Sequence, residues 1–70
     1  MITQDQLDNE FMYHAPKLEQ LPKYNALREK AKEFASLIVE LTPVCADQSA
    51  AIRKVREAVM TVNAAIAINS

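Results

Sequence analysis

The sequence predicts an all-α protein: an antiparallel helical hairpin with an irregular or short-helical N-terminal arm, assembling into a homo-oligomer. The chain contains no glycine, the residue on which tight β-hairpin turns and backbone with positive φ depend. Two long stretches carry apolar side chains at alternating steps of three and four residues, which is typical of packed helices. The 70 residues, of which 50% are hydrophobic, are enough for one small globular domain, residues 1–70.

The first helix of the hairpin is predicted over residues 22–42, after an arm over residues 1–21 that shows no sustained apolar period. Proline at residue 22 suits the first turn of a helix, where its missing N–H costs no hydrogen bond. Thr42-Pro43 ends the helix, because the residue before a proline is pushed out of the helical region. The apolar seam of this helix consists of Tyr24, Leu27, Ala31, Phe34, Ile38 and Leu41.

The second helix is predicted over residues 47–69, with Asp47 or Ser49 available to cap its start. A short polar turn separates it from the first helix, so the two seams face each other in an antiparallel pair. Its seam is formed by Ile52, Val55, Val59, Val62 and Ile66.

A second apolar face on this helix predicts self-association. After Glu57 no residue is charged, and a helix that is apolar most of the way round is normally buried on most sides. One partner helix cannot cover it, and ordering each residue costs roughly 1.5 kcal/mol, which a single seam offsets poorly in a short chain. A partner of different sequence is the alternative to self-association. The second face consists of Met60, Ala64, Ala67 and Ile68.

Composition argues against several functions. The net charge of -1 gives no overall field that would attract polymeric DNA or RNA. The uncharged stretch is too short to span a bilayer, the acidic start is unlike a signal peptide, and the single Cys45 indicates a reducing compartment. With one histidine, His14, and no ligand or nucleophile cluster, we expect no enzyme activity, no metal and no cofactor.

Binding of a small anionic ligand is better supported. Arg28 and Lys32 lie four residues apart on one face of the first helix, off its seam, with Lys30 on the flank. The arm carries an aromatic cluster over residues 11–14 that includes Tyr13. A ring can stack on a nucleobase and a guanidinium can fork onto phosphate, so arm and helix together suit a small nucleotide.

The alternative interpretation is purely structural. Arg28 and Lys32 could be solvated cations that pair with Glu29 and Glu33, as most charges on helix surfaces do. In that case Tyr13 would only cover the hydrophobic seam, and His14 would be an ordinary surface or packing residue.

Three segments of the chain resemble the helical-hairpin domain shared by phage anti-CBASS and anti-Thoeris sponges. They are YHAP at residues 13–16, KYNALREKAKEFA at residues 23–35 and AVMTVNAAIA at residues 58–67. The resemblance extends over residues 11–69 and favours the stand-alone anti-CBASS form. It implies a compact hexamer in the cytoplasm of the infected bacterial host. The hexamer would capture cyclic oligonucleotide second messengers stoichiometrically and so keep the defence effector silent.

The residues fit this role, because a cyclic dinucleotide is two-fold or nearly so and has two phosphates and two bases. Two protomers related by a two-fold axis could each give one stacking ring, Tyr13, and one cation, Arg28, with Lys32 and Lys30 as supporting charge. The predicted ligand-binding residues are Tyr13, Arg28, Lys32, Lys30, His14 and Asn63.

Two departures from the family pattern bear on ligand choice. Thr61 stands where the family has tryptophan, and Ile68 stands where it has an arginine in a region associated with a second site, for cyclic trinucleotides. We therefore expect cyclic dinucleotides to be preferred. The alternative function is a structural or regulatory helical oligomer that binds a protein partner. A sponge needs Tyr13 ordered beside Arg28, whereas a scaffold does not.

Overall fold

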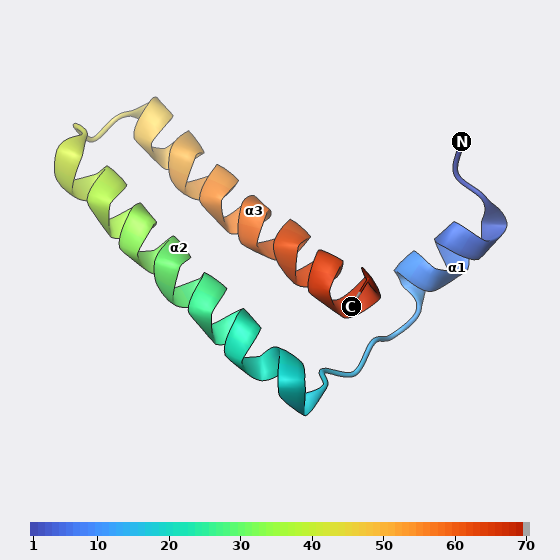
Figure 1. Ribbon diagram of the computed structural model, residues 1–70. Helices are drawn as coiled ribbons and strands as arrows, with labels where there is room; N and C mark the ends of the chain where they lie inside the picture. The colour runs from blue at the N-terminus through green and yellow to red at the C-terminus, as the bar shows by residue number, and fades with distance from the viewer. Residues whose placement is uncertain (70) are drawn as a thin grey trace.

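The structure, a computed structural model, describes residues 1–69 and is all-helical over that range (Figure 1). Two long helices form an antiparallel hairpin and a short helix lies on the N-terminal arm, which confirms the predicted all-α hairpin. The predicted assembly into a homo-oligomer stays a prediction. In chain order the elements are α1 (Gln4–Phe11), the 3-10 turn η1 (Leu18–Gln20), α2 (Leu21–Leu41) and α3 (Ala46–Asn69).

Helix α1 begins at a capping box. The Thr3 hydroxyl accepts a hydrogen bond from the Gln6 backbone N–H at 3.1 Å, and the Gln6 side-chain oxygen accepts one from the Thr3 N–H at 2.8 Å. These two bonds satisfy backbone donors that have no partner within the helix. The T-x-x-Q spacing that makes the box is visible in the sequence, where apolar periodicity gives no sign of a helix.

Helix α2 starts and ends one residue earlier than the predicted range of 22–42. It begins at Leu21, which places Pro22 in its first turn. It ends at Leu41 because Thr42, with φ -122° and ψ 152°, is held extended ahead of Pro43. Thr42 closes the last turn by donating to the Ile38 carbonyl from both its N–H, at 3.1 Å, and its hydroxyl, at 2.6 Å.

Helix α3 starts at Ala46, one residue before the predicted start at 47. Asp47 and Ser49 therefore lie inside the first turn, where an acidic side chain favours the helix dipole, and not ahead of it. Gln48 closes the inter-helix turn by donating from its side-chain amide to the carbonyl of Thr42, at 3.2 Å, and to its hydroxyl, at 3.0 Å. No helix within residues 1–69 has a stretch long and apolar enough to cross a membrane.

The contact line between α2 and α3 is narrower than the two predicted seams. Along α2 it follows Tyr24, Ala31 and Ile38, which are half-buried. Phe34 and Leu41, predicted on the seam, are 56% and 71% exposed because a single partner helix covers only part of the α2 circumference. On α3 the half-buried seam residues are Ile52, Val55, Val59 and Ile66.

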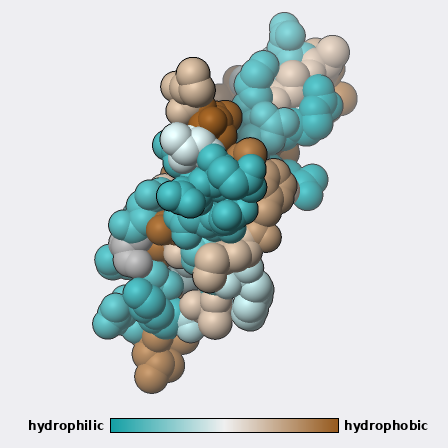
Figure 2. Space-filling view, turned by 90° about the vertical axis from the view of Figure 1, so that its right-hand side faces the viewer, coloured by the Kyte–Doolittle hydropathy of each residue, from teal (hydrophilic) through white to brown (hydrophobic). Residues whose placement is uncertain are grey.

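The single chain has no hydrophobic core. Within residues 1–69 no hydrophobic residue is buried, and hydrophobic side chains reach the surface among hydrophilic ones (Figure 2). The accessible surface is 5888 Å², against about 4,400 Å² for a folded monomer of this mass. The radius of gyration is 15.4 Å, against about 11 Å for a compact chain of this length. The protomer is a flat slab of 45 × 30 × 15 Å that leaves unusual amounts of apolar surface uncovered.

One polar residue is buried within residues 1–69, and it joins the two ends of the hairpin. Gln20, at 3% exposure, donates from its side-chain amide to the Ile66 carbonyl at 3.2 Å. Its side-chain oxygen accepts from the Lys17 N–H at 3.1 Å. The arm is thereby fastened to the C-terminal part of α3 at the end of the hairpin opposite the turn (Figure 1).

Candidate functional site

A groove rimmed by three cations runs along one side of the contact line between α2 and α3. Helix α2 contributes Arg28 and Lys32, spaced four residues apart, and α3 contributes Arg56 from across the hairpin. The groove has a volume of about 290 Å³, and we call it the cationic groove. Its apolar floor includes Ile52, Val59 and Met60.

The cationic groove is not neutralised by carboxylates. The one ion pair within residues 1–69 joins Lys30 Nζ to Glu33 Oε2 at 3.2 Å, so Arg28, Lys32 and Arg56 have no acidic partner there. The interpretation that Arg28 and Lys32 pair with neighbouring glutamates is therefore not what the structure shows. Three unpaired cations beside an apolar floor give a local positive site on a chain whose net charge is -1.

The opposite side of the hairpin has a second groove of about 300 Å³, which we call the apolar groove. Leu27 and Phe34 from α2 and Val62 from α3 line it. Lys30, predicted to support the charge of Arg28, borders this groove instead, and its ammonium group is already paired with Glu33. The structure thus separates Lys30 from the other two predicted cations.

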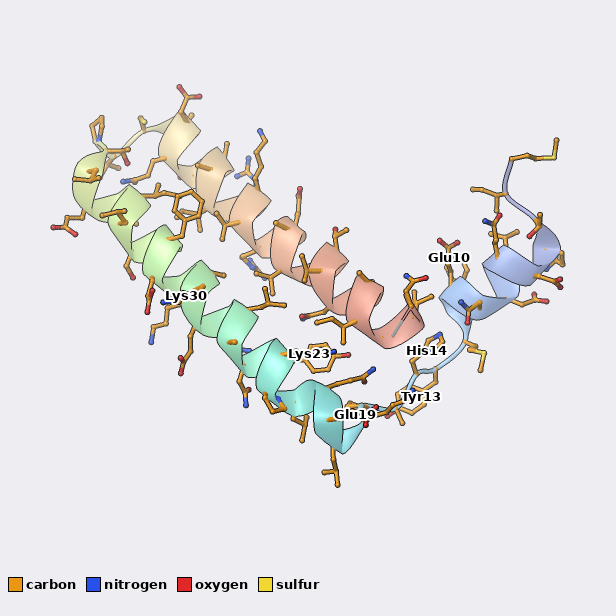
Figure 3. All side chains as sticks on the ribbon, viewed as in Figure 1. Glu10, Tyr13, His14, Glu19, Lys23 and Lys30 are labelled. Carbon is orange, nitrogen blue, oxygen red and sulfur yellow. The ribbon has the colours of Figure 1, made fainter. Side chains whose placement is uncertain are left out.

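Tyr13 and His14 lie in the loop that leaves α1, and Figure 3 shows both between Glu10 of α1 and Glu19 of η1. The Tyr13 side chain is 83% exposed, so its ring is not packed against the groove of its own chain. His14 is half-buried, and its Nε2 donates to the Asn9 carbonyl at 2.7 Å. Within one protomer no hydrogen bond joins Tyr13 to Arg28 among the described residues, and the exposed ring is available to a ligand or to a neighbouring copy.

Asn63 is half-buried and lies within α3, less than two turns before the helix ends at Asn69, so it is not a helix cap. Its side-chain oxygen is buried and accepts no hydrogen bond from any described residue. An unsatisfied buried acceptor costs roughly 1–3 kcal/mol. Because this oxygen is buried within the single chain, its lack of a partner is no evidence for a ligand, and the predicted ligand contact of Asn63 stays a prediction.

Arg56 is not among the residues predicted to bind a cyclic dinucleotide, because all of the predicted cations lie on the first helix. The signal was present: Arg56 is four residues from both Ile52 and Met60, so all three lie on the same flank of α3. Identifying it as part of the groove required knowing which flank of α3 faces the same side as Arg28.

The second apolar face of α3 is partly occupied by the protein's own arm. Ala64 and Ile68 border a hollow whose other wall is Gln6, Asn9 and Glu10 of α1. The prediction placed this whole face between protomers, but α1 folds back toward it and leaves Ile68 half-buried within one chain. The charged side chain that borders this hollow is a carboxylate, which disfavours an anionic ligand there.

The features above define a class: a helical hairpin whose groove offers cations and an apolar floor is a binding module. Within residues 1–69 no three His, Cys, Asp or Glu side chains gather to hold a metal ion. The family model described as the Acb2/Tad1 hairpin domain matches residues 3–67, so this protein belongs to that family. The family is one of binding domains and implies a sponge role against CBASS or Thoeris signalling. No curated protein and no solved structure matches the chain significantly.

Proposed function

We propose that this protein sequesters cyclic oligonucleotide second messengers of bacterial anti-phage signalling by stoichiometric binding, with cyclic dinucleotides as its first ligands. The observation that carries the proposal is the cationic groove, in which two helices present three cations around an apolar floor, none of them paired with a carboxylate of residues 1–69. Family membership supports the same role. The protein would act for a phage in the cytoplasm of the infected bacterial host, where it breaks no bond in its ligand.

The chemistry of a cyclic dinucleotide matches the groove. The ligand has two phosphates and two bases. The Arg28 guanidinium can bind one phosphate through two parallel hydrogen bonds, with Lys32 and Arg56 adding charge nearby. The exposed Tyr13 ring offers a stacking surface for a base, an interaction worth roughly 1–3 kcal/mol.

One protomer forms only part of such a site. Pockets for small ligands usually measure about 300–1,000 Å³, and the cationic groove lies at the lower limit. Two copies related by a two-fold axis would double the groove and place the Tyr13 ring of one copy within reach of the other.

The surface of the protomer supports self-association, which we propose to yield a hexamer. Relative to a compact monomer the chain exposes an excess of about 1,500 Å², more than the roughly 800 Å² that each partner buries in a standard interface. The apolar groove, with Leu27, Phe34 and Val62, is the part of that excess best suited to a second copy.

Cyclic trinucleotides should bind more weakly than cyclic dinucleotides. The hollow beside Ile68 lacks a cation among its described lining residues and contains Glu10, so a phosphate would gain little there. A cyclic trinucleotide that bound with nanomolar affinity in a site of its own would contradict this expectation.

Calorimetry of the purified protein against a panel of cyclic di- and trinucleotides tests the proposed function. We expect a cyclic dinucleotide to bind and Tyr13→Ala to weaken it about a hundredfold, because a two-fold site loses the ring twice. The control is Lys54→Ala, an exposed cation elsewhere on α3, which should leave the affinity unchanged. If the parent binds no cyclic nucleotide, the proposal fails and a helical oligomer that binds a protein partner takes its place.

A further inference from the structure

The structure assigns a role to His14 that differs from ligand contact: we infer that it is a positioning residue, which holds the loop carrying Tyr13 against the end of α1. The inference rests on the proposed function for the consequence in binding. The hold itself is a property of the free protein.

The Asn9 carbonyl explains why an imidazole is useful at residue 14. It is one of the last carbonyls of α1, and the helix ends before a backbone N–H can reach it, because Met12 is extended with φ -88° and ψ 155°. His14 Nε2 supplies the missing donor at 2.7 Å. A carbonyl oxygen only accepts, so the proton must be on Nε2. The imidazole therefore closes a loop between Asn9 and His14, which are five positions apart in the sequence.

This hydrogen bond restricts the backbone at Tyr13 because of where it lies in the sequence. Residue 13 lies within the closed loop, directly before the residue that closes it (Figure 3). The Tyr13 side chain is 83% exposed and gains little support from packing. The backbone on either side of the ring is consequently held by α1 and by His14, and α1 is itself seated beside the C-terminal part of α3.

Ordering the loop before binding should raise affinity. When only a fraction of the protein has the competent arrangement, the apparent dissociation constant rises in inverse proportion to that fraction. A hydrogen bond of ordinary strength shifts such a population by about three- to tenfold, and this is the change in affinity that we expect from its loss.

Two variants separate positioning from contact. His14→Leu removes the donor, whereas His14→Gln places an amide nitrogen near the position of Nε2 and can still donate to Asn9. We expect His14→Leu to weaken cyclic dinucleotide binding about three- to tenfold and His14→Gln to restore most of the loss. Circular dichroism should show that both variants keep the parent's helix content, with a loss no larger than the eight residues of α1.

Nuclear magnetic resonance of the free protein gives the independent readout. In the parent, the ring ¹⁵N shifts should show the Nε2–H tautomer, and backbone relaxation should show Tyr13 as ordered as α1. In His14→Leu the Tyr13 amide should become mobile on the nanosecond timescale, and in His14→Gln it should not. A parent that binds no cyclic nucleotide overturns the proposed function, while these relaxation data still decide whether His14 holds the loop.

The inference is overturned by either of two results. Parent-like affinity and an ordered Tyr13 in His14→Leu would show that the hydrogen bond holds nothing. Equal losses of affinity in His14→Leu and His14→Gln, with Tyr13 ordered in both, would show that the imidazole touches the ligand directly.

Discussion

The two grooves that flank the contact line between α2 and α3 share part of their floor and differ in the residues at their rims. Ala31, Val55 and Val59 border both. On one side the rim carries Arg28, Lys32 and Arg56, none of which has an acidic partner among the described residues. On the other side the rim is aliphatic and aromatic, and its one cation is already paired. A hairpin of two helices can thus present two surfaces with unrelated chemistry by changing residues one or two positions off the contact line.

The difference suggests a division of labour. Unpaired cations suit a phosphate ligand, because each charge-assisted hydrogen bond to a phosphate oxygen is strong. Such a local site does not require a high net charge on the whole protein. Exposed Phe34 and Leu27 suit contact with another copy, because their burial needs no ligand. Variants that each change one groove alone test this difference.

Phe34→Glu in the apolar groove should have the largest effect, dissociating the oligomer or unfolding it. A carboxylate buried without a partner costs several kcal/mol, and it would appear in every copy. Light scattering at micromolar concentration measures the mass. Ser36→Glu adds the same charge to the exposed outer side of α2 and should leave the mass unchanged. A parent that is a monodisperse, fully helical monomer would contradict the assembly outright.

Arg28→Ala in the cationic groove should weaken cyclic dinucleotide binding about a hundredfold or more without dissociating the oligomer. Each charged hydrogen bond contributes roughly 1.5–3 kcal/mol, and a two-fold site loses it twice. Calorimetry gives the affinity and light scattering the mass. An unchanged affinity in a folded, assembled variant would show that the ligand does not use this groove.

Arg56→Ala should cost about tenfold in affinity and should also flatten the dependence on salt. This variant asks whether the site spans both helices or belongs to α2 alone. Titrations at low and high ionic strength give both quantities, and Lys54→Ala on the same helix is the matched control. Equal salt dependence in Arg56→Ala and the parent would confine the site to α2.

Lys30→Ala should have the smallest effect, less than twofold in affinity and less than about 0.5 kcal/mol in stability. Lys30 and Glu33 are 79% and 66% exposed, so water screens their pair strongly. A urea titration beside the calorimetry measures both. A large loss of affinity would mean that the apolar groove, and not the cationic one, faces the ligand.

Much of the hairpin could be predicted from the sequence because its determinants are local. Apolar steps of three and four show that both helices exist, and Pro43 fixes the end of α2 through its effect on Thr42. The start of α1 was equally local, in the spacing of Thr3 and Gln6, but periodicity does not detect a capping box.

The candidate site could be predicted less well because it depends on which flank of each helix faces which side. Phe34 fits the heptad pattern of the seam, yet the rotation of α2 leaves it in the apolar groove. Lys30 is two residues from Arg28 in the sequence, but the two side chains border different grooves on opposite flanks of α2. Arg56 is distant in sequence and joins the groove through tertiary structure alone.

The short turn between Leu41 and Ala46, held by Gln48, has a consequence for timing. Most contacts in the chain lie within helices, and the two long helices follow one another directly in sequence, so the topology is largely local. Helical proteins with such a topology fold within microseconds to milliseconds. Ribosomes add about 5–20 residues per second, so a chain of 70 residues takes roughly 4–14 s to synthesise. If the proposed capture is right, the number of copies must match the number of molecules to be removed. Their supply would then be limited by translation and by the encounter of protomers, and hardly at all by folding.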